Sequence, residues 1–214
     1  MSKSTKVILI YGIVLYIMWA ILEILVVPMT NMNEQIVKEI VCKSIFWLLP
    51  SFYIIKNYNE DMCIKTKELY NIKEFKSCIY AIIISVIMLI IHMYSTYTIN
   101  GNIKISSSFD VIDILEACSI GLAEEFVFRG CFLNRMIKEK NKILMIILNS
   151  ILFLFIHFPI WIREGVFIIN MVDGLFITVI VLSIVFSWIL VKCKSIWGAV
   201  ILHILWDIFC VMFV

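Results

Sequence analysis

Two glutamates and one arginine lie within an almost wholly apolar stretch, GLAEEFVFRG, at residues 121–130. An ionised side chain at the middle of a membrane helix costs roughly 2.5 to 3.5 kcal/mol on insertion scales, so this helix is expected to contact other helices or to line a hydrated cavity. Glu125 and Arg129 are four residues apart, which allows an ion pair on one helix face. Glu124 lies about 100° away around the helix, which leaves its carboxylate available for chemistry.

Two histidines and an aspartate in later apolar segments can join Glu124. With a rise of about 1.5 Å per residue, Glu124, His157 and His203 lie roughly 18, 21 and 12 Å from the cytoplasmic ends of their predicted helices. Asp207 follows His203 by one helical turn and shares its face. Each residue taken singly could be a hydrogen-bonded packing residue. Their overlapping depth on three helices instead predicts one polar site in a cavity open to the cytoplasm.

The composition is that of a membrane protein. The chain has 214 residues, of which 63% are hydrophobic and 16% charged, and its mean hydropathy is +1.03. A soluble domain has roughly 45 to 50% apolar residues, so a polytopic membrane protein is predicted. Nothing in the charge pattern indicates nucleic-acid binding. The seven cysteines are never spaced as CxxC, so neither a disulfide framework nor a thiolate zinc site is expected.

The apolar pattern predicts an all-α fold, a polytopic transmembrane bundle of about seven helices plus one amphipathic cytoplasmic segment. The predicted spans cover about residues 7–27, 37–55, 78–93, 110–136, 143–158, 166–191 and 195–214. The first has no small-residue cleavage site after it and is expected to remain as a span. The fifth is expected to end at Pro159, because proline lacks an N–H donor. Residues 56–76 are too polar for lipid, and their apolar side chains suit a helix lying on the membrane surface.

The basic residues predict the orientation in the cell membrane. Most Lys and Arg residues fall in the segments that a cytoplasmic N-terminus places inside, while only Lys38, Lys43, Lys104 and Arg163 fall outside. The positive-inside rule therefore predicts a multi-pass protein with its N-terminus in the cytoplasm and its C-terminus outside. Glu23, near the outer end of the first span, reaches the interface, stays protonated there or pairs with Lys43.

Three short motifs resemble those of a known family. EEFVFR (residues 124–129), FLFIH (153–157) and HILWD (203–207) are similar to the EExxxR, FxxxH and HxxxN/D motifs of the CAAX protease and bacteriocin-processing family of intramembrane proteases. This family is also called the CPBP or Abi family and includes type II CAAX prenyl endopeptidases. The resemblance covers about residues 113–211, with the motifs in family order and on separate predicted helices.

The resemblance implies that the protein hydrolyses a peptide bond within the membrane. Glu124 would activate water with the help of His157, while His203 and Asp207 would stabilise the transition state. Many family members have Asn where this chain has Asp207. An ionised Asp cannot donate a hydrogen bond to an oxyanion, so Asp207 would have to be protonated, orient His203 or ligate a metal.

The resemblance also implies a structural pair and leaves two kinds of catalysis open. Glu125 and Arg129 would support the architecture of the site. Glu124, His157 and His203 are acceptable zinc ligands, so a metalloendopeptidase is one interpretation. No HExxH motif is present. Metal-free catalysis by glutamate and histidine is the interpretation that we favour, so no cofactor is expected.

The family motifs divide the chain into an N-terminal transmembrane region at residues 1–110 and a CPBP-like catalytic core at residues 111–214. The expected partners are the lipid bilayer and a peptide or membrane-protein substrate. Leader peptides of bacteriocins or signalling peptides fit better than a prenylated CAAX protein. The alternatives are a non-catalytic membrane partner, serving bacteriocin self-immunity or acting as a regulatory scaffold, and, third, a proton-coupled transporter.

Overall fold

A computed structural model describes residues 2–29, 40–73, 75–138 and 141–213. These residues form a helical bundle without β-strands, apart from one isolated bridge between Ile105 and Phe213. The all-α prediction is confirmed. In the N-terminal half the helices are α1 (Lys3–Ile21), which continues into η1 (Leu22–Val26) and η2 (Val27–Met29), then η3 (Lys43–Leu48), α3 (Leu49–Asn57), η4 (Asn59–Asp61), α4 (Thr66–Leu69) and α5 (Phe75–Asn100). In the C-terminal half they are α6 (Val111–Glu125), η5 (Phe126–Leu133), α7 (Asn134–Met136), α8 (Lys142–Phe155), α9 (His157–Arg163), α10 (Phe167–Val172), α11 (Leu175–Cys193) and α12 (Trp197–Met212).

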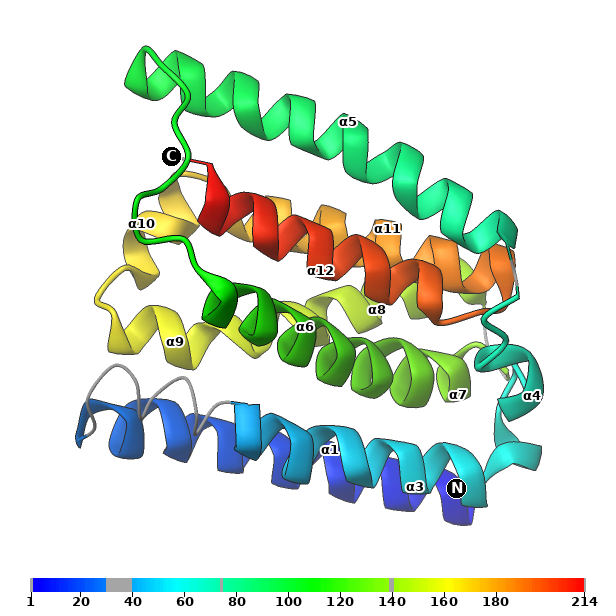
Figure 1. The fold of residues 1–214 in the computed structure, drawn as a ribbon. Helices are drawn as coiled ribbons and strands as arrows, with labels where there is room; N and C mark the ends of the chain where they lie inside the picture. Colours follow the sequence, from blue (N-terminus) through cyan, green and yellow to red (C-terminus); the bar gives the residue numbers. More distant parts are fainter. Residues whose placement is uncertain (1, 30–39, 74, 139–140, 214) are drawn as a thin grey trace.

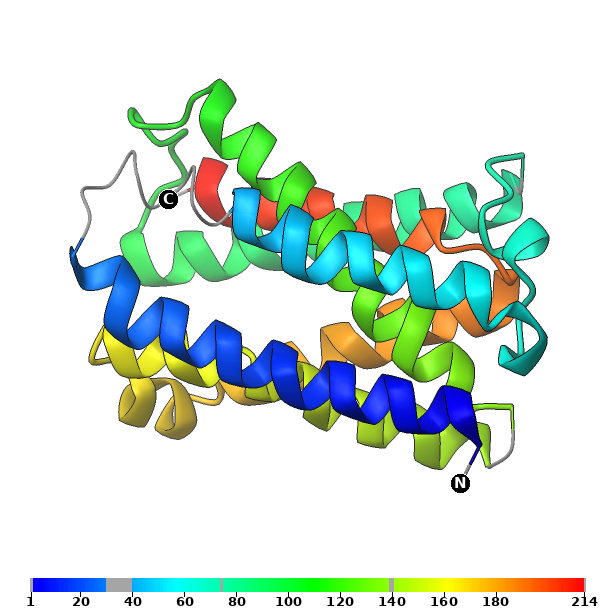
Figure 2. The same cartoon turned by 90° about the horizontal axis from the view of Figure 1, so that it is seen from below.

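The helices run roughly alongside one another (Figure 1), with α5 at one edge of the bundle and α1 with α3 at the opposite edge. Seen from below, α1 and α3 form the near layer (Figure 2). Helix α12 packs most extensively against α5 and α6. Large apolar side chains such as Ile10, Ile13 and Ile17 on α1 are exposed on the outside of the bundle. Such a surface suits lipid, whose tails are as apolar as these side chains.

Four helical segments among the described residues are long and apolar enough to cross a membrane. They are Lys3–Met29, Ile79–Asn100, Lys142–Arg163 and Leu175–Cys193, and α12 is a shorter apolar helix. The predicted span at 37–55 begins within residues 30–39, outside the described part of the chain. The predicted span at 110–136 corresponds to α6, η5 and α7, which carry several charged side chains.

Two predicted helix boundaries are wrong. The fifth predicted helix does not end at Pro159: α8 ends at Phe155, and Pro159 lies in the first turn of α9. Proline is tolerated there because the first N–H groups of a helix lack intrahelical partners in any case. The sixth predicted helix is divided into α10 and α11 by Gly174, whose φ of 83° is left-handed and favours glycine.

The segment at 56–76 does not form a single surface-lying helix. It folds into turns around the one-turn helix α4, and its apolar residues Met62, Ile64 and Leu69 are buried. The backbone N–H of Ile196 donates to the Leu69 carbonyl at 3.0 Å. This backbone hydrogen bond joins the turns to the residue that precedes α12. The segment therefore packs against the end of the bundle where α12 begins.

Gly121 allows a close approach between α6 and α12. A Cβ atom at this position would lie 2.7 Å from Cγ1 of Ile204 and 3.3 Å from its backbone N, both closer than an ordinary contact. Ile204 directly follows His203 in α12. The absence of a side chain at Gly121 therefore lets His203 reach the two glutamates that follow on α6.

Candidate active site

Three π-helical segments occur in the described chain, and each begins beside or contains a charged residue. Glu23 lies in η1, Lys43 begins η3, and η5 directly follows Glu125. A π-helix is rare and occurs mainly as a local bulge at functional sites. All residues of η5 are buried, so these wide turns position charged side chains inside the bundle.

Glu125 and Arg129 form the ion pair that their four-residue spacing predicts. Arg129 Nη1 donates to Glu125 Oε1 at 2.9 Å, and both side chains are completely buried. Arg129 Nη2 also donates to Ser183 Oγ on α11 at 2.7 Å. The guanidinium lies over the rings of Phe153 and Phe186, at 4.3 and 5.2 Å from their centroids. Arg129 thus joins α8 and α11 to the helix that carries both glutamates.

Glu124 is not free, contrary to the expectation from the sequence. Lys43 Nζ donates to Glu124 Oε1 at 2.8 Å, and both side chains are buried. The hypothesis that Lys43 pairs with Glu23 is not supported, since Glu23 is buried and accepts a hydrogen bond from Arg163 Nε at 2.9 Å. Lys43 lies within the largely apolar run VCKSIFW, and Glu124 likewise lies within a largely apolar stretch. A lone cation inside a predicted span could therefore have indicated a carboxylate partner across the bundle.

His203 lies between three carboxylates. Its Nδ1 is 2.8 Å from Glu125 Oε1, while its Nε2 is 3.5 Å from Asp207 Oδ2 and 3.8 Å from Glu124 Oε2. The ring stacks on Phe186 at a centroid distance of 5.0 Å. A carboxylate only accepts hydrogen bonds, so Nδ1 carries a proton. The Nε2 edge therefore faces Asp207 and the second oxygen of Glu124.

His157 lies at the break between α8 and α9, where its ring is partly exposed. Its Nδ1 is 3.2 Å from the Phe153 carbonyl oxygen. Because a carbonyl only accepts, Nδ1 is the donor, and the neutral ring keeps a lone pair on Nε2. The Phe153 ring contacts both His157 and His203, at centroid distances of 5.3 and 5.9 Å. His157 is therefore beside the other polar residues, separated from His203 by one aromatic ring.

The charges in this region nearly balance. The two cations and three carboxylates described here are Lys43, Arg129, Glu124, Glu125 and Asp207. A net negative charge inside a membrane protein is costly. One proton shared between Asp207 and the imidazole beside it would make the group neutral. The arrangement therefore contains both a proton acceptor and a proton that can be donated.

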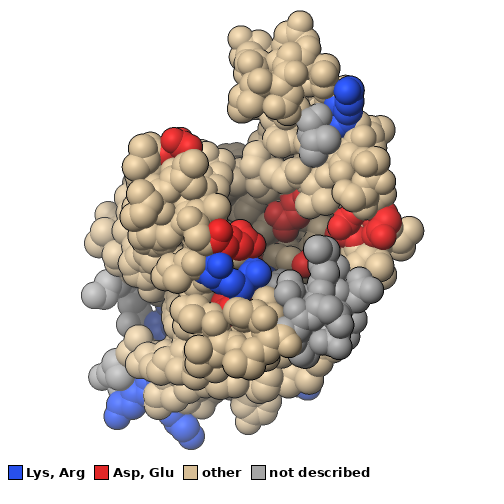
Figure 3. Space-filling model, turned by 90° about the vertical axis from the view of Figure 1, so that its left-hand side faces the viewer, with Lys and Arg blue, Asp and Glu red and all other residues tan. Residues whose placement is uncertain are grey.

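A hollow opens at the end of the bundle opposite the N-terminus. Figure 3 views this end and shows acidic side chains inside the hollow and around it. Asp207, which is partly exposed, lies in the second half of α12, toward the C-terminus at this same end. A cytoplasmic N-terminus and a cavity open to the cytoplasm were both expected from the sequence. The structure is compatible with only one of these expectations, because the hollow and the N-terminus lie at opposite ends.

The residues considered for zinc do not fit a zinc site as they are arranged. Within the described part of the chain, no group of three or more His, Cys, Asp or Glu side chains is arranged so that it could hold a metal ion. The Lys43 ammonium already occupies the neighbourhood of the Glu124 carboxylate at 2.8 Å. A divalent cation there would meet a positive charge, so no step is assigned to a metal.

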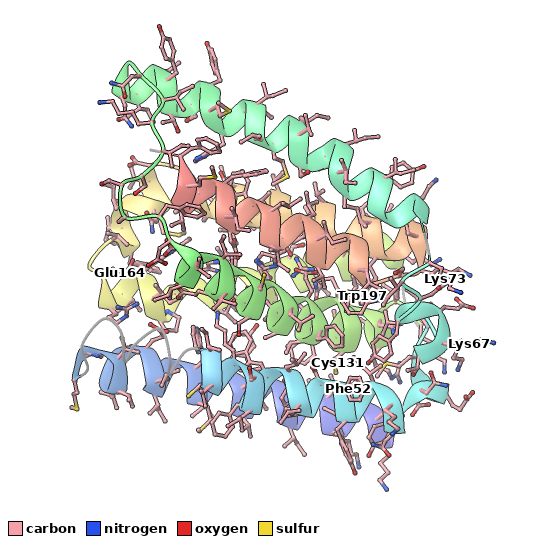
Figure 4. All side chains as sticks on the ribbon, in the orientation of Figure 1. Phe52, Lys67, Lys73, Cys131, Glu164 and Trp197 are labelled. Carbon is pink, nitrogen blue, oxygen red and sulfur yellow. The ribbon has the colours of Figure 1, made fainter. Side chains whose placement is uncertain are left out.

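Cys131, in η5, is completely buried. Figure 4 shows its label near those of Phe52 and Trp197, toward the end of the bundle with α4, whereas Glu164 lies at the opposite end. Cys63, Cys118, Cys131 and Cys210 form no disulfide bond. These features agree with the interpretation of the cysteines as small apolar residues.

A cavity of about 480 Å³ lies elsewhere, between α1, η5 and α8. Its lining is mainly apolar and includes Ile8, Tyr16, Phe132 and Leu152. None of the glutamates or histidines discussed above lines this cavity. This cavity is therefore separate from the polar site.

The fold and the site define a helical membrane protein with a buried cluster of carboxylates and histidines. Residues 107–209 match the family model described as Rce1-like: Type II CAAX prenyl endopeptidase Rce1-like. This match covers slightly less than half of the 214 residues and confirms the resemblance carried by the three motifs. No curated protein and no solved structure matches the chain. The matched region includes Glu124, His157, His203 and Asp207 but not Lys43.

Proposed function

We propose that the protein is an intramembrane endopeptidase that hydrolyses a peptide bond of a membrane-associated peptide or protein. One observation carries the proposal: the buried Glu124 carboxylate lies 3.8 Å from the imidazole of His203, which also faces Asp207. The family match supports a protease in general. Amide hydrolysis needs a general base and a proton donor close together. The Glu124 carboxylate can accept a proton, and the neighbouring pair of His203 and Asp207 can donate one.

In the proposed reaction Glu124 accepts a proton from a water molecule, and the water oxygen bonds to the peptide carbonyl carbon. The lone pair on His157 Nε2 helps to orient this water. The carbonyl π electrons move to its oxygen, and the resulting oxyanion is stabilised by the proton shared between His203 and Asp207. Glu124 then transfers its proton to the amide nitrogen as the C–N bond breaks. General base catalysis contributes typically about 10²- to 10⁴-fold.

Asp207 can take part in this scheme because a proton is available to it. A fully ionised aspartate would repel an oxyanion. Its Oδ2 lies 3.5 Å from His203 Nε2, so one proton can serve both groups. This proposal accounts for an aspartate where many relatives of this family have asparagine.

The hydrolysis is proposed to need no metal. If so, incubation of the purified protein with EDTA or 1,10-phenanthroline should leave the cleavage rate within about twofold of the untreated protein, because Glu124 and His157 activate water directly. The measurement is the initial rate of peptide cleavage by untreated protein and by protein that has been incubated with the chelator. Loss of activity that added zinc restores would contradict metal-free catalysis.

The hollow suggests where a substrate approaches. With the N-terminus in the cytoplasm, as the basic residues predict, the hollow faces outside, so the expected cytoplasmic opening is not retained. A peptide must reach it unwound, because a helix shields its carbonyl groups and lipid leaves no partner for free backbone groups. Exported leader peptides of bacteriocins or signalling peptides are therefore the proposed substrates.

Comparison of the peptides from cells with the native protein and with Glu124→Ala tests the proposed function. We expect specific peptides with new termini only with the native protein, at equal abundance of both proteins in the membrane. A biological effect that survives Glu124→Ala, with no difference in peptides, would instead support the alternative of a non-catalytic immunity or regulatory partner.

A further inference from the structure

A buried lysine from the N-terminal half contacts the proposed base. Lys43, the first residue of η3, lies outside the matched residues 107–209. Its Nζ is 2.8 Å from Glu124 Oε1, and only 2% of its side chain is exposed. Burying an ammonium group is costly unless it is paired and held in good geometry. The position of Lys43 therefore demands a reason beyond packing.

Two tryptophans hold the ammonium group in place. Lys43 Nζ lies 4.8 Å from the ring centroid of Trp19 and 5.3 Å from that of Trp47, within the range of cation–π attraction. Trp19 Nε1 donates to the carbonyl of Ile156 at 2.9 Å. Ile156 directly precedes His157, at the break between α8 and α9. The Trp19 side chain therefore contacts both Lys43 and the backbone beside this histidine.

In the proposed reaction, negative charge moves away from the carboxylate that Lys43 contacts. When Glu124 accepts a proton from water, its negative charge disappears and an equal charge forms on the carbonyl oxygen of the substrate. The ammonium of Lys43 then loses its partner at Oε1 while a new anion forms nearby. A fixed cation at such a position stabilises the transition state without reorganisation.

On the basis of the proposed function, we propose that Lys43 is a further catalytic residue, which neutralises Glu124 at rest and stabilises the oxyanion once Glu124 is protonated. The lysine would supply the donor that an asparagine at position 207 would otherwise provide. Asp207 donates only while it holds the shared proton, whereas the ammonium of Lys43 has three donors at all times.

The inference is tested with the purified full-length protein and a peptide identified by the comparison of native and Glu124→Ala cells. Lys43→Met should lower kcat by about 10²- to 10³-fold, the usual effect of removing one oxyanion donor, with KM changed by less than about threefold. Asp207→Asn in the Lys43→Met background should restore kcat at least about tenfold, because the amide supplies a permanent donor. The same substitution should give a smaller gain when Lys43 is present.

The matched control is Lys65→Met, which removes a lysine that pairs with Glu60 at the surface and should leave kcat unchanged. If Lys43→Met does not accumulate in membranes, Lys43→Arg and Lys43→Gln replace it. The charged variant should be at least about tenfold faster than the neutral one. Equal rates for these two variants would overturn the inference.

Two results with Lys43→Met would also overturn the inference. An unchanged or raised kcat would show that the lysine does not assist the reaction, and a raised value would identify it as an inhibitory clamp on Glu124. Failure of Asp207→Asn to restore activity in the Lys43→Met background would exclude the proposal that Lys43 supplies the hydrogen-bond donor that an asparagine at position 207 would otherwise provide. Each of these results leaves an active native enzyme, whereas a native protein without peptidase activity would overturn the proposed function as well.

Discussion

Replacement of Glu124 by glutamine is expected to lower the rate of peptide cleavage by about 10²- to 10⁴-fold, the contribution of a positioned general base. Glutamine keeps the size of the side chain and its hydrogen-bonding capacity, but its amide cannot accept the proton from water. The measurement is kcat of the purified variant on a peptide that the native protein cleaves. A variant within about threefold of the native rate would exclude Glu124 as the base.

The stability of this variant needs its own control, because the substitution also removes the Glu124 carboxylate from beside a buried ammonium group. Lys43 and Glu124 form an ion pair with both side chains almost completely buried. Removing one partner of such a pair typically destabilises a protein by about 3 to 5 kcal/mol. The double variant Lys43→Met/Glu124→Gln removes both charges and should unfold closer to the native temperature while remaining inactive. Glu60→Gln, at an exposed surface pair, should change neither property.

Replacement of Arg129 by methionine is expected to destabilise the folded protein by about 3 to 5 kcal/mol, because it leaves the buried carboxylate of Glu125 without its cation. A loss of this size is a large fraction of the roughly 5 to 15 kcal/mol that stabilises a typical protein. The variant should therefore unfold at a markedly lower temperature in detergent and accumulate poorly in membranes.

Two further substitutions distinguish a structural ion pair from other causes. Glu125→Gln/Arg129→Met should recover much of the lost stability, since it removes both charges. Arg129→Lys should recover little, because one ammonium cannot reproduce the planar fork that contacts both Glu125 and Ser183. Native-like unfolding of Arg129→Met would contradict a structural role for the pair.

Charged residues within apolar runs predicted the centre of the bundle well. The four-residue spacing of Glu125 and Arg129 predicted their ion pair, and the one-turn spacing of His203 and Asp207 predicted their proximity. These contacts lie within single helices, where the backbone geometry determines which side chains meet. The helical class could be predicted from the apolar composition. In lipid, the backbone N–H and C=O groups of a spanning segment must form their hydrogen bonds within that segment, as they do in a helix.

Contacts between distant helices could not be predicted in the same way. Lys43 and Glu124 are 81 residues apart, and neither their spacing nor their hydropathy relates one to the other. The break before His157 was also misplaced, because Pro159 is accommodated in the first turn of α9. The assignment of residues 1–110 and 111–214 to separate regions stays a prediction, although Lys43 and Trp19 contact the proposed core from the first of them.

The origin of the oxygen in the new carboxyl terminus tests the central claim most directly. The purified native protein is incubated in H₂¹⁸O with a peptide substrate, and the products are analysed by mass spectrometry. We predict one ¹⁸O atom in the new carboxylate from a single turnover, and no detectable product with Glu124→Gln or with His203→Ala in the time that the native protein needs for that turnover. Cleavage that persists in both variants, or a native protein that yields no labelled product, would contradict an endopeptidase built on this buried carboxylate and imidazole.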